Sequence, residues 1–413
     1  MTDPRPLSGI RVVDLSHFTA GPMCTKLLAD AGADVVAVEP LGGEPSRALE
    51  PRLTGPDGYA EGSLYVRLAF DKRSIALNLK SAAGHDVLLR LLANADVLVE
   101  SFRPGVMDRL GLGYDVVHER CPRLVYVSLS GFGQPTVADG PYSARPSYDP
   151  IVQAMSGLAQ VTPGVDGHAG LVGASIADTV PGMMAAYGTS LALLSRLRTG
   201  TGTHVDVAQY DVMLLANDRN IARYLNTGGE TTADQPVPYV PHGVFPAADG
   251  DLVIALATEP QWVAFCGVLG RPDLLDDPRT ADPAARRASY DTFLRPLLVA
   301  WLSGRTRAEA VDAMLAVGIP AGPVQRAADI ADCPQAAARG MLRSAEHPRL
   351  GTVHGLGAAP RLRDSPPPGE VSAPPVLGQH TAEVLGAAGY SAADIAGLAA
   401  DGVIGVAEPS PTR

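Results

Sequence analysis

Short apolar runs alternate with amphipathic segments through the first half of the chain. The apolar runs predict strands at residues 10–15, 35–38, 74–79, 97–99, 124–129 and 205–207. Between them, apolar positions at helical spacing predict helices at residues 22–31, 82–93, 106–110 and 116–120. Strands separated by helices are typical of an α/β fold with a mostly parallel sheet and right-handed crossovers.

A longer helix is predicted to begin beside Asp178 and to end at Gly200. Arg196 and Arg198 fall in its last turn, and basic residues followed by glycine are common stop signals. Aspartate is a favoured N-cap, and Pro181 would then occupy the first turn, where its missing N–H does no harm. Alternatively, a carboxylate held ionised near a helix N-terminus can attack a carbonyl group. The pattern leaves both roles of Asp178 open.

The second half of the chain contains a change of composition that predicts a domain boundary. Residues 227–238 read TGGETTADQPVP, which is rich in turn-forming and polar residues. A strand at residues 252–256 and helices at 259–269, 291–302 and 307–317 follow, and the prolines near residue 320 indicate a return to the first domain. Short helices are predicted at residues 381–388 and 392–400. A chain of 413 residues is long enough for two domains.

Composition and charge exclude several classes of function. The 46% hydrophobic and 19% charged residues are those of an ordinary globular protein, and the net charge of -11 argues against nucleic-acid binding. The four cysteines are far apart and form no CxxC pair, which indicates reduced thiols and no cysteine zinc site. The most apolar window, residues 183–194, is too short to cross a bilayer. We expect a cytoplasmic protein without a metal or membrane partner.

Basic residues in the first half of the chain are candidates for binding an anionic ligand. They lie at predicted junctions between strands and loops: Arg47, Lys72, Arg73, Lys80, Arg103 and Arg109. In an acidic protein, such a set suits an anion at the switch point of a parallel sheet. Solvated charges paired with nearby acids are an equally good interpretation of each one. Walker, HExxH and GxSxG motifs are absent, and Gly200-Thr-Gly-Thr is a weak glycine pattern.

Several segments, in order, resemble the class III CoA-transferases, a family that also contains the α-methylacyl-CoA racemases. They lie at residues 6–16, 20–22, 28–40, 71–80, 95–105, 129–133 and from Asp178 through Asp206. The resemblance implies a Rossmann-like large domain formed by both chain ends, residues 1–225 and 331–413. It implies a smaller α/β domain at residues 226–330, and two subunits threaded through each other as an interlocked homodimer.

The resemblance also implies that CoA or acyl-CoA binds as a substrate along the large domain, with a small carboxylic acid as the second substrate. No tightly bound cofactor is implied. The positions that match the CoA contacts of the family are Thr19, Ala20, Leu77, Asn78, Leu79, Lys80, Ser101, Phe102, Arg103 and Arg109, and we place Tyr148 in the same site. Ammonium and guanidinium groups such as those of Lys80 and Arg109 make charge-assisted bonds to phosphate.

Asp178 falls at the position of the family's catalytic aspartate. The implied reaction is acyl-CoA:carboxylate CoA transfer through a mixed anhydride and an aspartyl-CoA thioester, with backbone N–H groups of glycine-containing loops stabilising the oxyanions. Asp149 is a second catalytic candidate that could orient the substrate or the Asp178 loop. An ordinary turn acid before Pro150 is the alternative interpretation of Asp149.

The main alternative function is an α-methylacyl-CoA racemase or epimerase. That branch pairs its aspartate with an upstream histidine in a Gly-His-Asp context, whereas this chain has Ser147-Tyr148-Asp149. Tyrosine, with a pKa near 10, is a poor base at neutral pH, so the substitution favours transfer. A non-catalytic CoA-binding protein is a further alternative. Three arginines are candidates for binding a second carboxylate of the acid: Arg145, Arg219 and Arg223.

Overall fold

The computed structural model describes residues 5–230, 239–363 and 371–407. The chain divides into two compact units. One consists of Met1–Ala233 together with Ala338–Arg413, and the other of Asp234–Ala337. The first is called the large unit here and the second the small unit. Residues 231–238 of the predicted boundary segment lie outside the described residues.

A mainly parallel sheet forms the centre of the large unit. Its strands, in spatial order, are β14 (Ile404–Gly405), β5 (Lys72–Leu77), β2 (Asp34–Glu39), β1 (Arg11–Asp14), β6 (Val97–Glu100), β7 (Val125–Ser130) and β8 (His204–Ala208). All neighbouring pairs are parallel except β14 and β5. The order reverses at β1, because the chain runs outward through β2 and β5 on one side and through β6, β7 and β8 on the other.

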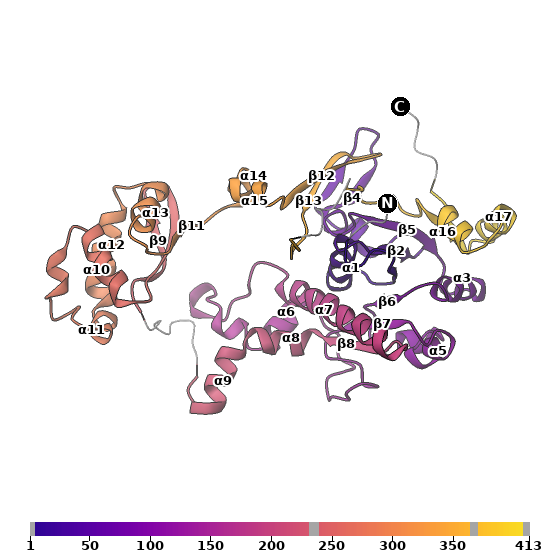
Figure 1. The fold of residues 1–413 in the computed structure, drawn as a ribbon, viewed down its shortest axis with the longest axis horizontal. Coiled ribbons are helices and arrows are strands. Elements are labelled where there is room, and N and C mark those ends of the chain that lie inside the picture. Colours follow the sequence, from indigo (N-terminus) through magenta and orange to yellow (C-terminus); the bar gives the residue numbers. More distant parts are fainter. Residues whose placement is uncertain (1–4, 231–238, 364–370, 408–413) are drawn as a thin grey trace. The chain divides into compact units, whose positions relative to one another are not determined.

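Helices cover both faces of this sheet (Figure 1). On one side are α3 (Ala82–Leu92), α4 (Val106–Arg109), α5 (Tyr114–Arg120), α16 (Thr381–Ala387) and α17 (Ala392–Ala400). On the other are α1 (Ala20–Asp30), α7 (Ile176–Thr199) and α8 (Gln209–Ala216). The remaining helices of this unit are α2 (Ser63–Val66), α6 (Asp149–Met155) and α9 (Asp218–Thr227).

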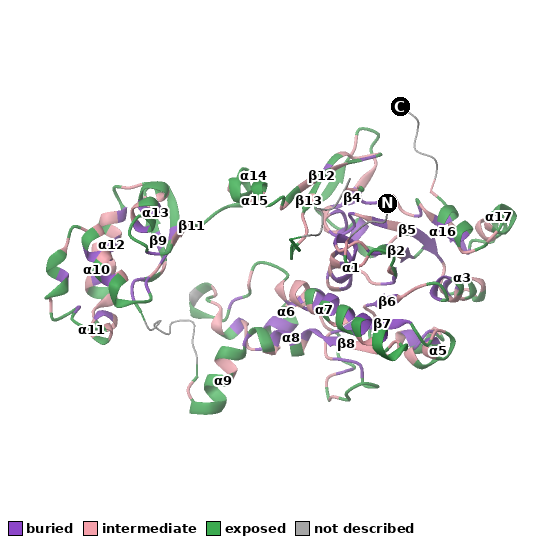
Figure 2. Cartoon of the chain, in the orientation of Figure 1, coloured by how far each residue is buried: buried purple, intermediate pink, exposed green. Residues whose placement is uncertain are grey.

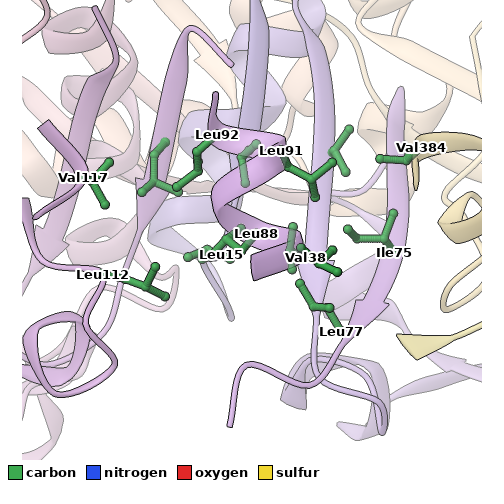
Figure 3. Packing of buried hydrophobic residues seen from close by; sticks show 14 of the residues in the cluster. Leu15, Val38, Ile75, Leu77, Leu88, Leu91, Leu92, Leu112, Val117 and Val384 are labelled. Atoms are coloured by element: carbon green, nitrogen blue, oxygen red, sulfur yellow. The ribbon is translucent and has the colours of Figure 1, made fainter. Parts of the chain in front are cut away.

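Two apolar cores lie between the sheet and these helical layers, because successive strand residues point to opposite faces. In β6, Leu98 packs into the core on the α3 side, whereas Val97 and Val99 pack into the core on the α7 side. Figure 3 shows the first core, in which Leu88 of α3 lies near Leu15 and Val38. A sheet buried on both faces explains why its strands are continuous apolar runs in the sequence.

The C-terminal part of the chain completes the large unit. The hairpin β12 (Leu342–His347) and β13 (Gly351–Leu356) packs Val353 against Phe70 and its neighbours, close to the small hairpin β3 (Arg52–Thr54) and β4 (Ala60–Gly62). Arg343 of β12 forms ion pairs with Asp30 at 3.1 Å and Asp71 at 2.9 Å. Further along, β14 pairs with β5, the strand that precedes Lys80.

The small unit has its own core. Its antiparallel sheet contains β9 (His242–Ala247), β10 (Gly250–Ala255) and β11 (Ala321–Pro323). Its helices are α10 (Glu259–Val268), α11 (Pro283–Ala288), α12 (Arg295–Leu302), α13 (Arg307–Leu315), α14 (Ala327–Ala331) and, at the unit boundary, α15 (Pro334–Ala338). Buried Phe245, Trp262 and Phe265 are the aromatic residues of this core.

The α/β fold and nearly all of the predicted elements are confirmed, with ends that shift by one or two residues. The predicted helix at residues 291–302 is wrong in its first turn, which is a π-helical segment at Tyr290–Leu294. The pattern missed α6, α8 and α9, and it missed the β12–β13 hairpin. Most residues of this hairpin are exposed or half-buried, and its buried residues are too few to form an apolar run. Within the described residues, no helix is both long and apolar enough to cross a bilayer.

Candidate active site

The loops that follow β1 and β6 meet at the point where the strand order of the sheet reverses. The backbone N–H of His17 donates a hydrogen bond to Ser101 Oγ at 3.1 Å, so the two loops are in direct contact. Ligands of open α/β sheets bind in the crevice at the carboxyl ends of the strands beside such a reversal. Thr19, Ala20, Ser101 and Phe102, which the sequence analysis assigned to CoA, therefore lie at one place.

A group of aromatic rings borders this position. The His17 ring lies 4.9 Å from the Phe18 ring and 5.4 Å from the Phe102 ring, measured between centroids. The Tyr148 ring, which is 63% exposed, lies edge-on to Phe18 at 6.4 Å. Phe18 has a φ of 64°, a left-handed conformation that is uncommon for a bulky residue. Phe102 and Tyr148, predicted separately, thus belong to one aromatic group.

The segment Leu77–Lys80 lies at the end of β5, two strands away from β1 and therefore about 10 Å along the same edge. Leu77 is buried in the core, so its backbone is the part that faces the edge. Asn78 Oδ1 accepts a hydrogen bond from the Lys80 N–H at 3.1 Å, and the Leu79 carbonyl lies 2.6 Å from His85 Nε2. These contacts shape the turn that presents the exposed Lys80 side chain.

The six candidate basic residues separate into two groups. Lys80, Arg103 and Arg109 are exposed and form no ion pair within the described parts of the chain. The other three are paired internally: Arg47 with Glu39 and Glu61, Lys72 with Asp14, and Arg73 with Asp34 and Glu383. The ion-pair interpretation holds for this second group, which contributes to folding rather than to an open anion site.

Asp178 is the third residue of α7, because the helix begins at Ile176 with Ser175 as its N-cap. The prediction that Asp178 caps the helix and Pro181 lies in its first turn is wrong. Pro181 lies within the helix, where it cannot donate a hydrogen bond to the carbonyl of Ala177. The Asp178 carboxylate is half-buried and accepts a 2.6 Å hydrogen bond at Oδ1 from Gln209 Nε2.

Asp149 supplies the cap that neither Ser175 nor Asp178 provides. Its Oδ1 accepts a 2.7 Å hydrogen bond from the Ala177 N–H, and its Oδ2 accepts one of 2.7 Å from Gln153 Nε2. Asp149 opens α6, so this bond joins the starts of α6 and α7. The result places a second carboxylate next to Asp178.

The environment of Asp178 makes its carboxylate more basic than an ordinary aspartate. Burial raises the pKa of Asp178 to about 6, and the negative charge of Asp149 adds to the rise. The Gln209 hydrogen bond and the positive charge of Arg67 oppose the rise. A carboxylate with such a pKa is largely ionised at neutral pH and is a stronger nucleophile than an exposed aspartate.

Close approach of α1 and α7 places the predicted CoA residues beside Asp178. A Cβ on Gly182 would come within 2.5 Å of the Ala20 carbonyl oxygen and 2.8 Å of Met23 Cβ. Only glycine at this position therefore allows the second turn of α7 to lie against the first turn of α1. Thr19, which precedes α1, accepts a 3.1 Å hydrogen bond from Arg67 Nη2 at its hydroxyl oxygen.

A comparison with known proteins shows the family of this chain. The family model of CoA-transferase family III matches residues 7–381. The chain belongs to CoA-transferase family III. It is therefore an enzyme of the CoA-transferase class, and CoA thioesters are substrates of such enzymes. Within the described residues, no group of three or more His, Cys, Asp or Glu side chains could hold a metal ion.

Individual members of the family are similar over most of the chain. A succinyl-CoA:mesaconate CoA-transferase of Haloarcula marismortui is 35% identical over 93% of this chain and 96% of its own length. An acetyl-CoA:oxalate CoA-transferase of Acetobacter aceti is 38% identical over 82% of this chain and 85% of its own. The crystal structure of a CaiB/BaiF family protein from Brucella suis matches with a TM-score of 0.83 at 30% identity, covering 93% of this chain and 99% of that one.

The sequence analysis did not find three residues of the candidate site. Arg67 and Gln209 were missed because they come near Asp178 only in the folded chain. Glu100, the last residue of β6, is buried, and its Oε2 accepts a 2.8 Å hydrogen bond from the Phe102 N–H. Burial raises the pKa of Glu100 to about 7. Of the three, only Glu100 could have been found from the sequence, because a charged residue at the end of an apolar strand is unusual.

Proposed function

We propose that the enzyme transfers CoA from an acyl-CoA to a free carboxylic acid through covalent intermediates on Asp178. The observation that carries this proposal is the half-buried Asp178 carboxylate, which has one oxygen bound to Gln209 and a pKa raised to about 6. It lies at the start of α7, against the α1 turn that contains the proposed CoA contacts Thr19 and Ala20. Nucleophile and thioester would thus share one end of the sheet.

The first half of the reaction forms an aspartyl-CoA thioester. A free Asp178 oxygen attacks the thioester carbonyl, the C–S bond breaks, and CoA leaves as its thiolate, which gives a mixed anhydride. The thiolate then attacks the aspartyl carbonyl and releases the donor acid as a carboxylate. Each step exchanges one anionic nucleophile for one anionic leaving group, so no proton is consumed.

The second half reverses these steps with the acceptor acid. Its carboxylate attacks the aspartyl-CoA carbonyl and expels the thiolate, and the thiolate attacks the acceptor's acyl carbonyl to form the new acyl-CoA and restore Asp178. Asp149 contributes by holding the start of α7 through the Ala177 N–H. Backbone N–H groups of the surrounding loops are the proposed donors to the transient oxyanions.

For the bound CoA, we propose the residues at the sheet edge as its contacts. Lys80, Arg103 and Arg109 are exposed cations that suit its phosphates. The loop after β6 contributes Ser101 and Phe102, and the turn after β5 contributes Leu77, Asn78 and Leu79 through backbone and polar groups. Tyr148 lies next to Phe18 on the Asp178 side of the aromatic group and would contact the thioester end.

The acids are proposed from the chemistry named for the relatives. Succinyl-CoA:mesaconate and acetyl-CoA:oxalate enzymes transfer CoA to dicarboxylic acids. We therefore propose a dicarboxylic acid as acceptor and a short acyl-CoA as donor. A racemase would need a second base near Asp178, and tyrosine at position 148 suits that role poorly.

We propose further that the enzyme acts as an interlocked homodimer. Five large apolar side chains form an exposed stripe along α7: Met183, Tyr187, Leu191, Leu194 and Leu197. Exposed and buried segments alternate along this helix in Figure 2. An exposed apolar stripe of this length is typical of a protein–protein interface, and a second copy of the chain is the partner that a closed dimer requires.

The proposal is tested by trapping Asp178. The enzyme is incubated with acetyl-CoA or succinyl-CoA, hydroxylamine is added, and the peptide containing Asp178 is examined by mass spectrometry for hydroxamate formation. Asp178→Ala should form no adduct and transfer no CoA, while Asp276→Ala, an exposed aspartate in the small unit, should behave as wild type. Transfer by Asp178→Ala at the wild-type rate excludes the mechanism. Exchange of the α-proton with solvent deuterium in the absence of any acceptor would instead support racemisation.

A further inference from the structure

Arg67 is a half-buried cation at the end of α2, close enough to Asp178 for the two charges to interact. Its Nη2 donates a hydrogen bond to Thr19 Oγ1, and the charge of Asp178 raises the Arg67 pKa, although burial lowers it overall. Among the described residues, no carboxylate lies within ion-pair distance of its guanidinium. Arg47 and Arg343, by contrast, have close carboxylate partners.

A guanidinium has five N–H donors in a planar fork. Among the residues that the structure describes, Arg67 donates a side-chain hydrogen bond only to Thr19. Desolvating a cation without a paired anion is costly, so a structure keeps such a group mainly where a ligand completes it. The natural complement of the fork is a carboxylate that accepts two parallel hydrogen bonds. Arg67 therefore has the chemistry of an unfilled carboxylate site next to Asp178.

The charge at the site changes during the proposed reaction. In the resting enzyme, Asp178 is the negative neighbour of Arg67. In the aspartyl-CoA intermediate this charge is gone, whereas Asp149 remains bound to the Ala177 N–H. The incoming acid is itself an anion and must approach Asp149. Arg67 becomes available at the stage when a cation is needed to offset that repulsion.

We propose that Arg67 binds the second, non-reacting carboxylate of a dicarboxylic acceptor and thereby selects diacids over monoacids; this inference rests on the proposed function. A carboxylate held by two hydrogen bonds in the Arg67 fork has its oxygens directed at the guanidinium and is poorly placed to attack the aspartyl carbonyl. The other carboxylate of the same molecule stays free for that attack. Binding by Arg67 of the reacting carboxylate itself would tie up the lone pairs needed for attack.

The test follows the second half-reaction alone. The aspartyl-CoA enzyme is formed from acetyl-CoA, separated from the donor, and mixed with oxalate, succinate or glutarate, or with succinamate or hydroxylamine. Succinamate keeps the length of succinate but replaces one carboxylate by a neutral amide, and hydroxylamine needs no carboxylate site. Decay of the adduct is followed by mass spectrometry in wild type, Arg67→Gln, Arg67→Lys and the exposed-arginine control Arg120→Gln.

In Arg67→Gln, attack by the preferred diacid should slow by about 10- to 100-fold, the range expected for losing a charge-assisted hydrogen-bonded pair. Attack by succinamate and by hydroxylamine should change by less than about threefold, and Arg67→Lys should recover part of the diacid rate because it keeps the charge. Arg120→Gln should match wild type with all of these nucleophiles.

Several results would overturn the inference. An equal loss of rate with every nucleophile in Arg67→Gln would indicate a structural role. A loss of rate confined to diacids in Arg145→Gln instead of Arg67→Gln would assign the role to Arg145. A wild-type enzyme that prefers monoacids to all three diacids would leave no diacid selectivity to explain. Absence of any trapped adduct in wild type contradicts the proposed mechanism itself. If the adduct forms in Arg67→Gln and diacids still discharge it at the wild-type rate, only the role of Arg67 is contradicted. Adduct formation also reports that the variant is folded.

Discussion

Asp149 accepts a hydrogen bond from the backbone N–H of Ala177, although 28 residues separate the two along the chain. The bond caps the N-terminus of α7, in which Asp178 directly follows Ala177. It also brings a second negative charge to the nucleophile, and this charge contributes to the raised Asp178 pKa. One side chain therefore both positions the start of α7 and raises the pKa of the proposed nucleophile.

The pH dependence of the enzyme follows from the Asp178 pKa. Attack on the thioester needs the ionised carboxylate, so we expect log(kcat/KM) for the acyl-CoA to fall with unit slope below about pH 6 and to be level above it. Initial rates between pH 4.5 and 8 measure this midpoint. A midpoint near the ordinary aspartate value would show that burial does not control the nucleophile.

Replacing Asp149 by asparagine should move that midpoint to lower pH. Asparagine keeps an oxygen that can accept from the Ala177 N–H but removes the negative charge that raises the Asp178 pKa. Asp149→Ala also removes the cap and should lower the free energy of unfolding by about 1 kcal/mol. Thermal unfolding of both variants separates the two effects, and an unchanged midpoint in Asp149→Asn contradicts the assigned repulsion.

The substitution Gln209→Met should shift the midpoint in the opposite direction. The Gln209 amide stabilises the charged form of Asp178 through its 2.6 Å hydrogen bond, so its loss should raise the Asp178 pKa and weaken activity at pH 6 more than at pH 8. The pH–rate profile again supplies the measurement. Shifts of the same sign in Gln209→Met and Asp149→Asn would be incompatible with this geometry.

Asp178→Asn should abolish transfer and yet stabilise the fold at neutral pH. The raised pKa means that the folded protein binds the Asp178 proton more tightly than the unfolded chain does, so stability is present below pH 3.8 and is lost as pH rises through about 6. Neutral asparagine avoids this loss and should gain about 2 kcal/mol above pH 6, after allowance for partial exposure. Urea unfolding at pH 4 and pH 8 should show the gain only at the higher pH, while kcat falls at least about 1,000-fold.

Gly182→Ala tests the close approach of α1 and α7. The added Cβ would collide with the Ala20 carbonyl oxygen, so we expect a loss of about 1–3 kcal/mol in stability and a higher KM for acyl-CoA, because the turn at Thr19 and Ala20 must move. The matched control is Gly397→Ala in α17, where the new Cβ meets nothing within 4 Å. That control should be neutral or stabilising. An unchanged KM in Gly182→Ala would separate the α1 turn from CoA binding.

The sequence by itself determined the α/β fold, because strands buried on both faces must be apolar along their whole length and the helices that cover them must be amphipathic. It also located Asp178 and Asp149 through the family resemblance. The tertiary structure decided how these residues act. Helix-cap rules, which consider only neighbouring residues, offered Asp178 as a candidate N-cap of α7, whereas the cap comes from Asp149 in a distant segment.

The same limit applies to the cations. The sequence pattern did not distinguish Arg47 and Lys72 from Lys80, but the fold pairs the first two with carboxylates and leaves the third exposed. Nothing in the sequence singled out Arg67, and only the folded chain brings it into contact with Thr19 and near Asp178. Local pattern determines which segments are buried, since burial requires apolar side chains at regular spacing. Charge, pKa and ligand contacts depend on distances between segments far apart in the chain, and only tertiary packing sets those distances.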